Sequence, residues 1–253
     1  MSDLELMRAL LPAAEHAGRA IMEIYAEPPR AEEKSDGTPV TAADRAAEEI
    51  LIAALTKHAP DIPIISEEDA ATHATAPADR FFLVDPLDGT REFLRRDGRG
   101  AFTVNIGLIE RGCPVAGIVH APALERTFYA AGGTACEVRN GIALPIRIRP
   151  CPAAGPLAVA SRSHRDAETE AWLTEHAITE TVATGSSLKF CLVAAGEADV
   201  YPRFGPTMEW DTAAGDAILR AAGGRVETPG EKKELIYGKS EYRNGAFIAR
   251  GNY

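Results

Sequence analysis

Residues 81–93 constrain the fold more than any other stretch of this chain. The apolar run Phe81-Phe82-Leu83-Val84 predicts a buried strand. We expect this strand to end at Asp85, because Pro86 has no N–H group to donate to a neighbouring strand. Gly89 then permits a tight backbone turn. The stretch therefore predicts a buried strand that delivers acidic residues to one turn.

The turn after this strand brings together groups that bind cations and phosphates. Thr90 is a favourable N-cap for a short helix through Leu94. Asp85, Asp88 and the Leu87 carbonyl supply the oxygen ligands that hard cations prefer. A helix N-terminus attracts phosphate oxygens. An ordinary turn with an Asp cap has the same local sequence, so this motif alone leaves both interpretations open.

The net charge of −10 limits the partners that the chain can bind. It argues against polymeric nucleic acid or an anionic membrane, but it still admits a small anionic substrate in a pocket of opposite local charge. The 4 cysteines form no CxxC pair and no zinc spacing, which is typical of reduced thiols. No stretch reaches the roughly 20 apolar residues of a membrane span, and the first residues do not resemble a signal peptide. We predict a cytoplasmic protein without a transmembrane segment.

The pattern before the central strand predicts two helices and a short strand. Apolar residues form one stripe over 3–26, which predicts a helix. Thr41 caps a second helix and Asp44 completes a variant of the capping box, so Asp44 has a full structural explanation. Residues 32–37 form a polar loop, either a solvated surface loop or a mobile flap over a site. A short apolar run over 62–65 predicts a strand.

The period of the apolar residues changes to two after Ala101. This alternation, with Gly-containing turns, predicts half-buried strands in an antiparallel meander over 101–149. Prolines and glycines at 150–156 predict a linker between two domains, residues 1–152 and residues 153–253. Strands and helices alternate in the second domain, which implies an α/β sheet.

Four acidic residues stand at the ends of predicted elements: Glu67, Asp85, Asp88 and Asp211. If these residues meet in one pocket, they need cations, because desolvated like charges repel strongly. Ligation by oxygen alone favours magnesium or manganese over zinc. Asp211 opens a helix predicted over 211–222, so a helix N-cap explains this residue equally well on local grounds.

Motifs spread over nearly the whole chain give it a specific resemblance. They are Pro39-Val40-Thr41-Ala42-Ala43-Asp44, Ser66-Glu67-Glu68, Asp85-Pro86-Leu87-Asp88-Gly89-Thr90 and Trp210-Asp211-Thr212-Ala213-Ala214-Gly215. With these motifs the chain resembles the inositol monophosphatase superfamily of magnesium-dependent, lithium-sensitive phosphatases. Ser66-Glu67-Glu68-Asp69, Gly185-Ser186-Ser187-Leu188-Lys189-Phe190 and Met208-Glu209-Trp210-Asp211 resemble its CysQ-type 3'(2'),5'-bisphosphate nucleotidases.

The resemblance implies an α/β (α+β) fold with layers in the order αβαβα. An antiparallel sheet would lie in the N-terminal half and a smaller α/β sheet in the C-terminal half. Residues 1–152 would then form an α+β metal-binding domain, and residues 153–253 an α/β domain that sets substrate specificity.

The resemblance also implies that two Mg²⁺ ions bind at the acidic residues. Glu67, Asp85 and the Leu87 carbonyl would hold the first ion. Asp85, Asp88 and Asp211 would hold the second. All of these ligands are oxygen atoms, as magnesium requires.

A third ion and the catalytic groups follow from the same resemblance. The third, looser ion would lie near Glu67 and Glu68. The backbone amides of Gly89 and Thr90 would hold the scissile phosphate, and Asp44 and Thr90 would orient the attacking water.

The second half would then bind the remainder of the substrate. Ser186, Lys189 and Arg203 are predicted to hold a second phosphate, although a lone helix lysine is more often a solvated surface residue. His164 would stack on or hydrogen-bond an adenosine, or is an ordinary histidine after a strand. Glu209 is either a ligand of a substrate hydroxyl or a surface acid. The implied substrate contacts also include Leu87, Asp88, Gly89, Thr90 and Asp211.

The activity implied by the resemblance is hydrolysis of the 3'-phosphate of adenosine 3',5'-bisphosphate to AMP, and also of 3'-phosphoadenylyl sulfate, in sulfate assimilation. An inositol or sugar monophosphatase is the alternative within the family, and a non-catalytic nucleotide or metal sensor is the alternative of another class. The expected partner is a small bisphosphate nucleotide, and the sequence leaves a homodimer open.

Overall fold

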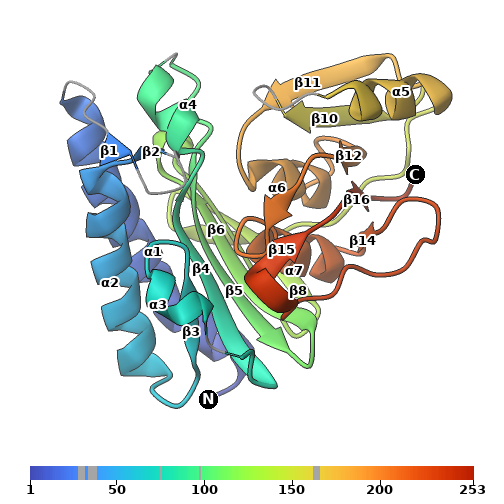
Figure 1. The fold of residues 1–253 in the computed structure, drawn as a ribbon. Helices are drawn as coiled ribbons and strands as arrows, with labels where there is room; N and C mark the ends of the chain where they lie inside the picture. Colours follow the sequence, from blue (N-terminus) through green and yellow to red (C-terminus); the bar gives the residue numbers. More distant parts are fainter. Residues whose placement is uncertain (28–31, 34–38, 75, 97, 162–165) are drawn as a thin grey trace.

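Helices and sheets form successive layers in the computed structural model, which describes residues 1–27, 32–33, 39–74, 76–96, 98–161 and 166–253. Two long N-terminal helices lie against one face of a large sheet, and the C-terminal half lies beyond its other face (Figure 1). Among the described residues, no helix is both long enough and apolar enough to span a bilayer.

The first layer consists of α1 (Asp3–Ala26) and α2 (Ala42–His58). Both helices begin with a capping box, which satisfies N–H groups that the start of a helix leaves without partners. In α2 this box joins Thr41 and Asp44. The apolar faces of both helices pack on sheet residues such as Phe82. The helices predicted over 3–26 and after Thr41 are confirmed.

The second layer is a seven-stranded sheet in the order β3-β4-β5-β6-β7-β8-β9. β3 runs parallel to β4, and all later neighbours are antiparallel, which confirms the predicted meander. The strands are β3 (Ile64–Ser66), β4 (Arg80–Asp88), β5 (Thr103–Glu110), β6 (Cys113–Ala121), β7 (Arg126–Ala131), β8 (Thr134–Arg139) and β9 (Ile142–Pro145).

The third layer, α6 (Leu188–Ala194) and α7 (Ala213–Ala221), packs very closely on the other face of this sheet. A Cβ atom added at Gly107 would lie 2.6 Å from the Cβ atom of Ala213, so α7 can approach β5 only because this strand residue is glycine. β5 is therefore buried on both faces, and the predicted half-buried strand is wrong because α7 covers the face expected to meet solvent.

The fourth layer is a five-stranded sheet in the order β11-β10-β12-β16-β14. β10 is parallel to β11 and β12, whereas β16 is antiparallel to β12 and β14. Neighbouring residues of β10 point to opposite faces: Val159 joins the core beneath α6 and α7, and Ala158 joins the core beneath α5. The elements are β10 (Leu157–Ser161), α5 (Ala167–Glu175), β11 (Glu180–Thr184), β12 (Val200–Arg203), β14 (Arg225–Glu227) and β16 (Phe247–Arg250).

With α5 as the fifth layer, the order αβαβα expected from the resemblance is confirmed. The domain boundary predicted after residue 152 falls between β9 and β10 and stays a prediction. The remaining elements are β1 (Glu32–Glu33), β2 (Pro39–Val40), α3 (Ala70–His73), α4 (Thr90–Arg95), the 3₁₀ helices η1 (Pro122–Leu124) and η2 (Ser240–Tyr242), β13 (Thr207–Met208) and β15 (Arg243–Asn244).

The central strand differs from its prediction at both ends of the acidic turn. β4 passes through Pro86 to Asp88, so the predicted end at Asp85 is wrong. The register with β5 shifts between Asp85 and Asp88, and at such a bulge the missing N–H of a proline costs no ladder hydrogen bond. Gly89, with φ of 92°, is the N-cap of α4, so the predicted cap at Thr90 is also wrong.

Candidate active site

Three carboxylates from distant parts of the sequence meet beside the acidic turn. Oxygen atoms of Glu67, Asp85 and Asp211 all lie within 4.8 Å of one another. Glu67 follows β3, Asp85 lies within β4, and Asp211 precedes α7. The structure thus brings together three of the four acids that the sequence singled out, and we call these three residues the carboxylate cluster.

The environment of Asp85 is unusual for a buried carboxylate. Its side chain is 1% exposed, and its Oδ1 accepts a hydrogen bond of 3.0 Å from the Leu87 N–H. Its Oδ2 is buried and has no hydrogen-bond partner in the described part of the chain. Burial raises the pKa of Asp85 well above its usual value, and the charges of Glu67, Asp88 and Asp211 raise it further.

Asp211 shares this electrostatic crowding. Burial raises its pKa well above the usual value, and the charges of Asp88 and Glu67 raise it further. An oxygen without a partner among crowded carboxylates is a donor set that fits a hard divalent cation. The three residues therefore fit a metal ion.

The local role of Asp211 is not the predicted one. Thr212 occupies the N-cap position of α7, so the interpretation of Asp211 as the helix cap is wrong. Its Oδ2 instead accepts a hydrogen bond of 2.9 Å from the N–H of Met208, which closes the short turn before the helix. Glu68 is half-buried and lies outside the carboxylate cluster.

Asp88, the fourth acid, is held by a residue that the sequence analysis missed. Its Oδ2 accepts hydrogen bonds from the N–H of Ser187 at 2.6 Å and from the Ser187 hydroxyl at 2.8 Å. Asn105 donates to the same hydroxyl at 2.9 Å. Burial raises the pKa of Asp88, while Lys189 and Ser187 oppose this rise. The adjacent serines in Gly185-Ser186-Ser187 were the available signal, but only the first was selected.

Asp44 and Thr90 form a contact between the helical layer and the acidic turn. The Oδ2 of Asp44 accepts from the backbone and the hydroxyl of Thr41, both at 2.7 Å. Its Oδ1 lies 3.4 Å from the Thr90 hydroxyl, which is also 3.3 Å from the Leu87 carbonyl. Asp44 is therefore part of the capping box of α2 and also a neighbour of Thr90, the residue predicted to orient the attacking water with it.

A cleft of about 260 Å³ connects the acidic turn with the C-terminal half. Its lining combines acidic residues, among them Asp88 of the turn, with basic residues from α6 and β12. Its lining residues are Glu67, Asp88, Gly89, Thr90, Arg91, Glu92, Gly185, Ser186, Lys189, Phe190, Tyr201, Arg203, Thr207, Asp211 and Thr212.

Lys189 is a buried residue of this cleft and not a solvated surface lysine. Its side chain is 4% exposed, its Nζ donates to the Ser186 carbonyl at 2.6 Å, and the Nζ lies 5.0 Å from the centre of the Tyr201 ring. Burial lowers its pKa to about 8, with Asp88 opposing and Arg203 reinforcing the change. An ammonium group in this environment gains most from an added anion.

Arg203 and Ser186 complete the basic part of the cleft. The guanidinium of Arg203 donates to the carbonyls of Gly205 at 3.0 Å and Pro206 at 3.1 Å, which orients the side chain. Ser186 has a φ of 53°, in the left-handed region, which sets the direction of the chain before α6. The two residues predicted to join Lys189 therefore line the same cleft.

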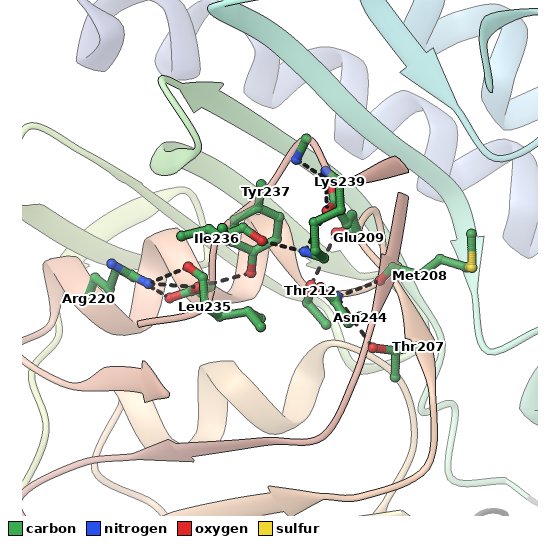
Figure 2. A network of polar contacts seen from close by, with 12 residues as sticks. Thr207, Met208, Glu209, Thr212, Arg220, Leu235, Ile236, Tyr237, Lys239 and Asn244 are labelled. Carbon is green, nitrogen blue, oxygen red and sulfur yellow. Dashed lines mark hydrogen bonds and ion pairs between the residues drawn. The ribbon is translucent and has the colours of Figure 1, made fainter. Parts of the chain in front are cut away.

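Glu209 fits neither of its two predicted roles. It is 0% exposed, so it is not a surface acid, and it is not among the residues that line the cleft. Its carboxylate accepts from the N–H groups of Gly238 at 2.7 Å and Lys239 at 3.0 Å, and the Lys239 ammonium lies 2.6 Å away (Figure 2). Glu209 is directed toward this backbone segment, because two N–H groups and an ammonium stabilise its charge there.

Two sequence predictions fall on residues beyond those described. His164, predicted to contact an adenosine, lies outside the described residues. Of the loop 32–37, predicted as a surface loop or a flap, only Glu32–Glu33 is described.

Comparisons with known proteins agree over almost the full chain. The inositol monophosphatase family model matches residues 3–251. The 3'(2'),5'-bisphosphate nucleotidase CysQ of Salmonella typhimurium is 49% identical over 224 residues, which cover 87% of this chain and 89% of that protein. The protein of the same name from Buchnera aphidicola is 40% identical over 251 residues, with 97% and 93% covered.

Solved structures give the same result for the fold. The crystal structure of CysQ from Bacteroides thetaiotaomicron, a bacterial member of the inositol monophosphatase family, has a TM-score of 0.84 and 38% identity, and covers 99% of this chain and 98% of that chain. An inositol monophosphatase from Anabaena has a TM-score of 0.74 and 26% identity, with 97% and 89% covered.

Proposed function

The chain belongs to the inositol monophosphatase family, and from this premise we propose that it hydrolyses the 3'-phosphate of adenosine 3',5'-bisphosphate to give AMP and phosphate. It also acts on 3'-phosphoadenylyl sulfate, and the reaction serves sulfate assimilation. The relatives named 3'(2'),5'-bisphosphate nucleotidase support this substrate class.

One observation carries the proposal: a single cleft contains both an acidic wall and buried cations. Glu67 and Asp211 supply the acidic part, and Lys189 and Arg203 the basic part. A phosphate monoester such as inositol monophosphate needs no second cationic subsite, whereas a bisphosphate does. The pair of subsites therefore favours a bisphosphate substrate.

Magnesium is the ion that we propose for the acidic wall. Glu67, Asp85 and the Leu87 carbonyl would hold one ion, and Asp85, Asp88 and Asp211 would hold a second. Such ions, when bound, lower the pKa of water and offset the charge of a transferring phosphoryl group. The buried and unpartnered Oδ2 of Asp85 is the atom that supports this ligand set most directly.

A third, looser ion near Glu67 and Glu68 belongs to the same proposal. We also propose that the two predicted domains have different roles. Residues 1–152 supply most metal ligands, and residues 153–253 supply the second phosphate subsite. Asp211 is the metal ligand that comes from the second part. The cytoplasmic location stays a prediction, which cell fractionation can test, and sedimentation can test the homodimer that the sequence leaves open.

The residues of the acidic turn orient the water and the phosphate. The Thr90 hydroxyl donates toward Asp44 and keeps a lone pair that can accept a hydrogen bond from the attacking water. The lone pair of that water is then free to face phosphorus, and its proton can pass toward Asp44. The N–H groups of Gly89 and Thr90 donate to the phosphate oxygens.

The second phosphate binds at Ser186, Lys189 and Arg203. The Lys189 ammonium and the Arg203 guanidinium are both buried and both line the cleft, so they need little reorganisation to receive an anion. An arginine can bind two phosphate oxygens at once, whereas a lysine acts as a point charge.

Release of phosphate from a panel of substrates tests the proposal. Purified protein with Mg²⁺ is assayed with adenosine 3',5'-bisphosphate, AMP and inositol monophosphate, and chelated samples serve as controls. We expect rapid release from the bisphosphate alone. Equal or faster turnover of inositol monophosphate would favour the alternative phosphatase, and nucleotide binding without phosphate release would favour a sensor.

A further inference from the structure

His73, the last residue of α3, contacts two segments that carry members of the carboxylate cluster. Its Nε2–H donates to the Ser66 carbonyl at 2.7 Å. Its ring stacks on Trp210, with ring centres 4.8 Å apart and planes inclined by 23°. Ser66 immediately precedes Glu67, and Trp210 immediately precedes Asp211. One imidazole therefore connects two positions that are far apart in sequence.

The Ser66 side of this connection is rigidly held. Ser66 is 0% exposed, and its hydroxyl donates to Glu48 at 2.6 Å. Its N–H donates to the Thr72 hydroxyl at 3.2 Å, while His73 occupies its carbonyl. The short helix α3, which lies beside β3 (Figure 1), thus fixes both backbone groups of the residue before Glu67.

The Trp210 side depends on packing. The indole is 4% exposed, and its Nε1 has no hydrogen-bond partner within the described part of the chain. Apart from the apolar core, its ring contacts are the stack on His73 and a tilted contact with Tyr242 at 6.3 Å. The imidazole face is therefore one of the surfaces that set the position of the segment carrying Asp211.

We propose that His73 is a positioning residue that fixes the spacing between Glu67 and Asp211 by tying together the two segments on which they stand. The proposal rests on the metal site of the proposed function. Like charges tend to push Glu67 and Asp211 apart, because their oxygens lie within 4.8 Å of each other. A brace outside the cluster keeps the oxygens at binding distance, so an arriving cation does not have to assemble the site.

Three substitutions separate the two contacts of His73. His73→Ala removes both the hydrogen bond and the stack. His73→Gln keeps a donor at the position of Nε2, and His73→Phe keeps the ring. If both contacts contribute, the Mn²⁺ affinities of the Gln and Phe variants lie between those of the parent and the Ala variant.

His176 provides a matched control. It also stacks on a tryptophan, Trp172, with ring centres 4.0 Å apart and planes inclined by 23°, and its Nδ1 donates to the Trp172 carbonyl at 2.9 Å. This pair lies in and after α5, in the outermost layer, and no residue of the carboxylate cluster adjoins it. His176→Ala therefore loses the same kind of contact without touching the site.

The test measures Mn²⁺ binding in the absence of substrate. The electron paramagnetic resonance signal of free Mn²⁺ is the readout. We expect His73→Ala to weaken Mn²⁺ binding about tenfold, as loss of a residue that orients metal ligands does, and His176→Ala to bind like the parent. In assays, the Mg²⁺ concentration for half-maximal rate rises in parallel, while kcat at saturating Mg²⁺ stays within about twofold.

Parent-like Mn²⁺ affinity in His73→Ala would contradict the positioning role of His73 and leave the proposed function intact. Equal weakening in His176→Ala also overturns it, because the effect is then a general loss of stability. If the parent protein binds no Mn²⁺, the result contradicts the metal site itself and therefore also the positioning role of His73. If His73→Ala does not fold, the order of affinities among the parent, Gln and Phe variants decides the question.

Discussion

Two groups of buried carboxylates in this molecule have opposite surroundings. Glu137 in β8 is 3% exposed. Its carboxylate forms ion pairs with two arginines: Oε1 lies 2.6 Å from Arg126 Nε, and Oε2 lies 2.7 Å from Arg139 Nη2. Asp85 in β4 is 1% exposed, and its nearest charged neighbours are the carboxylates of the cluster. The same burial therefore accompanies cations in one region and further anions in the other.

The consequence is a pKa change of opposite sign. Burial raises the pKa of Glu137, but hydrogen bonds and charges from Arg139 and Arg126 exceed that effect, and the pKa is lowered. For Asp85, burial and the neighbouring acids act in the same direction and raise the pKa. The chain thus balances its own charge around Glu137, whereas around Asp85 the balancing charge has to come from solution. This contrast is the physical basis of the proposed metal site.

The largest expected effect separates these two carboxylates by activity. Asp85→Asn removes a ligand shared by both proposed ions, so we expect phosphate release to fall by at least about 100-fold. Glu137→Gln leaves kcat within about twofold, because the charged partners of Glu137 in the described part of the chain, Arg126 and Arg139, belong to no proposed site. Initial rates at saturating Mg²⁺ measure both. Near-normal activity in Asp85→Asn would contradict the assignment of Asp85 as a shared ligand.

Lys189 sharpens the comparison, because it is a buried cation that lines the same cleft as Glu67 and Asp211. Lys189→Ala removes a buried charge from the proposed second phosphate subsite, so we expect kcat/KM for adenosine 3',5'-bisphosphate to fall by about 30-fold. The value for a monophosphate substrate changes little. Since the pKa of Lys189 is lowered to about 8, the preference of the parent for the bisphosphate also declines as pH rises above about 8. A uniform loss across substrates would remove Lys189 from this role.

Metal addition provides a third test of the contrast, through stability. A cation that binds only the folded state at 100 times its Kd contributes about 2.7 kcal/mol, which is about 5–10 °C in Tm for a chain of this size. We expect this shift on adding Mg²⁺ to the chelated parent and to Glu137→Gln. Asp85→Asn shows a much smaller shift. Equal shifts in all three proteins would place the stabilising ion elsewhere.

The smallest effect is the pH dependence of stability without metal. Asp85 has a folded pKa above its usual 3.8, so its stabilising contribution is present below that pH and is lost as pH rises through the folded value. Glu137 has a lowered pKa, so its contribution is present above 4.5 and is lost as pH falls.

Urea unfolding of chelated samples between about pH 3 and 8 measures both contributions. The free energy of unfolding of the parent declines relative to Asp85→Asn as pH rises. Relative to Glu137→Gln it declines as pH falls below about 4.5. Parallel curves for the parent and Asp85→Asn would show that Asp85 experiences no electrostatic crowding.

The sequence identified the parts of the site that depend on short-range chemistry. The contacts of Thr41 with Asp44 follow from a capping pattern only a few residues long. The left-handed turn at Gly89 follows from the freedom of glycine. Such features are decided locally, so neighbouring residues in the sequence suffice to predict them.

The failures at Pro86, Glu209 and Ser187 share one cause, which is packing between distant segments. Pro86 remains in β4 because the bulge opposite β5 removes the need for its N–H, and the sequence of β4 alone does not show a bulge. Glu209 is buried because the N–H groups of Gly238 and Lys239 arrive from a segment that follows α7. Ser187 reaches Asp88 only through the fold. Local patterns contain no information on these partners.

The most direct test of the account is a crystal structure with Mn²⁺, with anomalous scattering used to locate the ion. We predict an anomalous peak among Glu67, Asp85 and Asp211, with the Oδ2 of Asp85 as a ligand. No peak there at saturating Mn²⁺, with the three carboxylates turned apart or bonded to protein groups, would contradict the metal site and the hydrolytic function built on it.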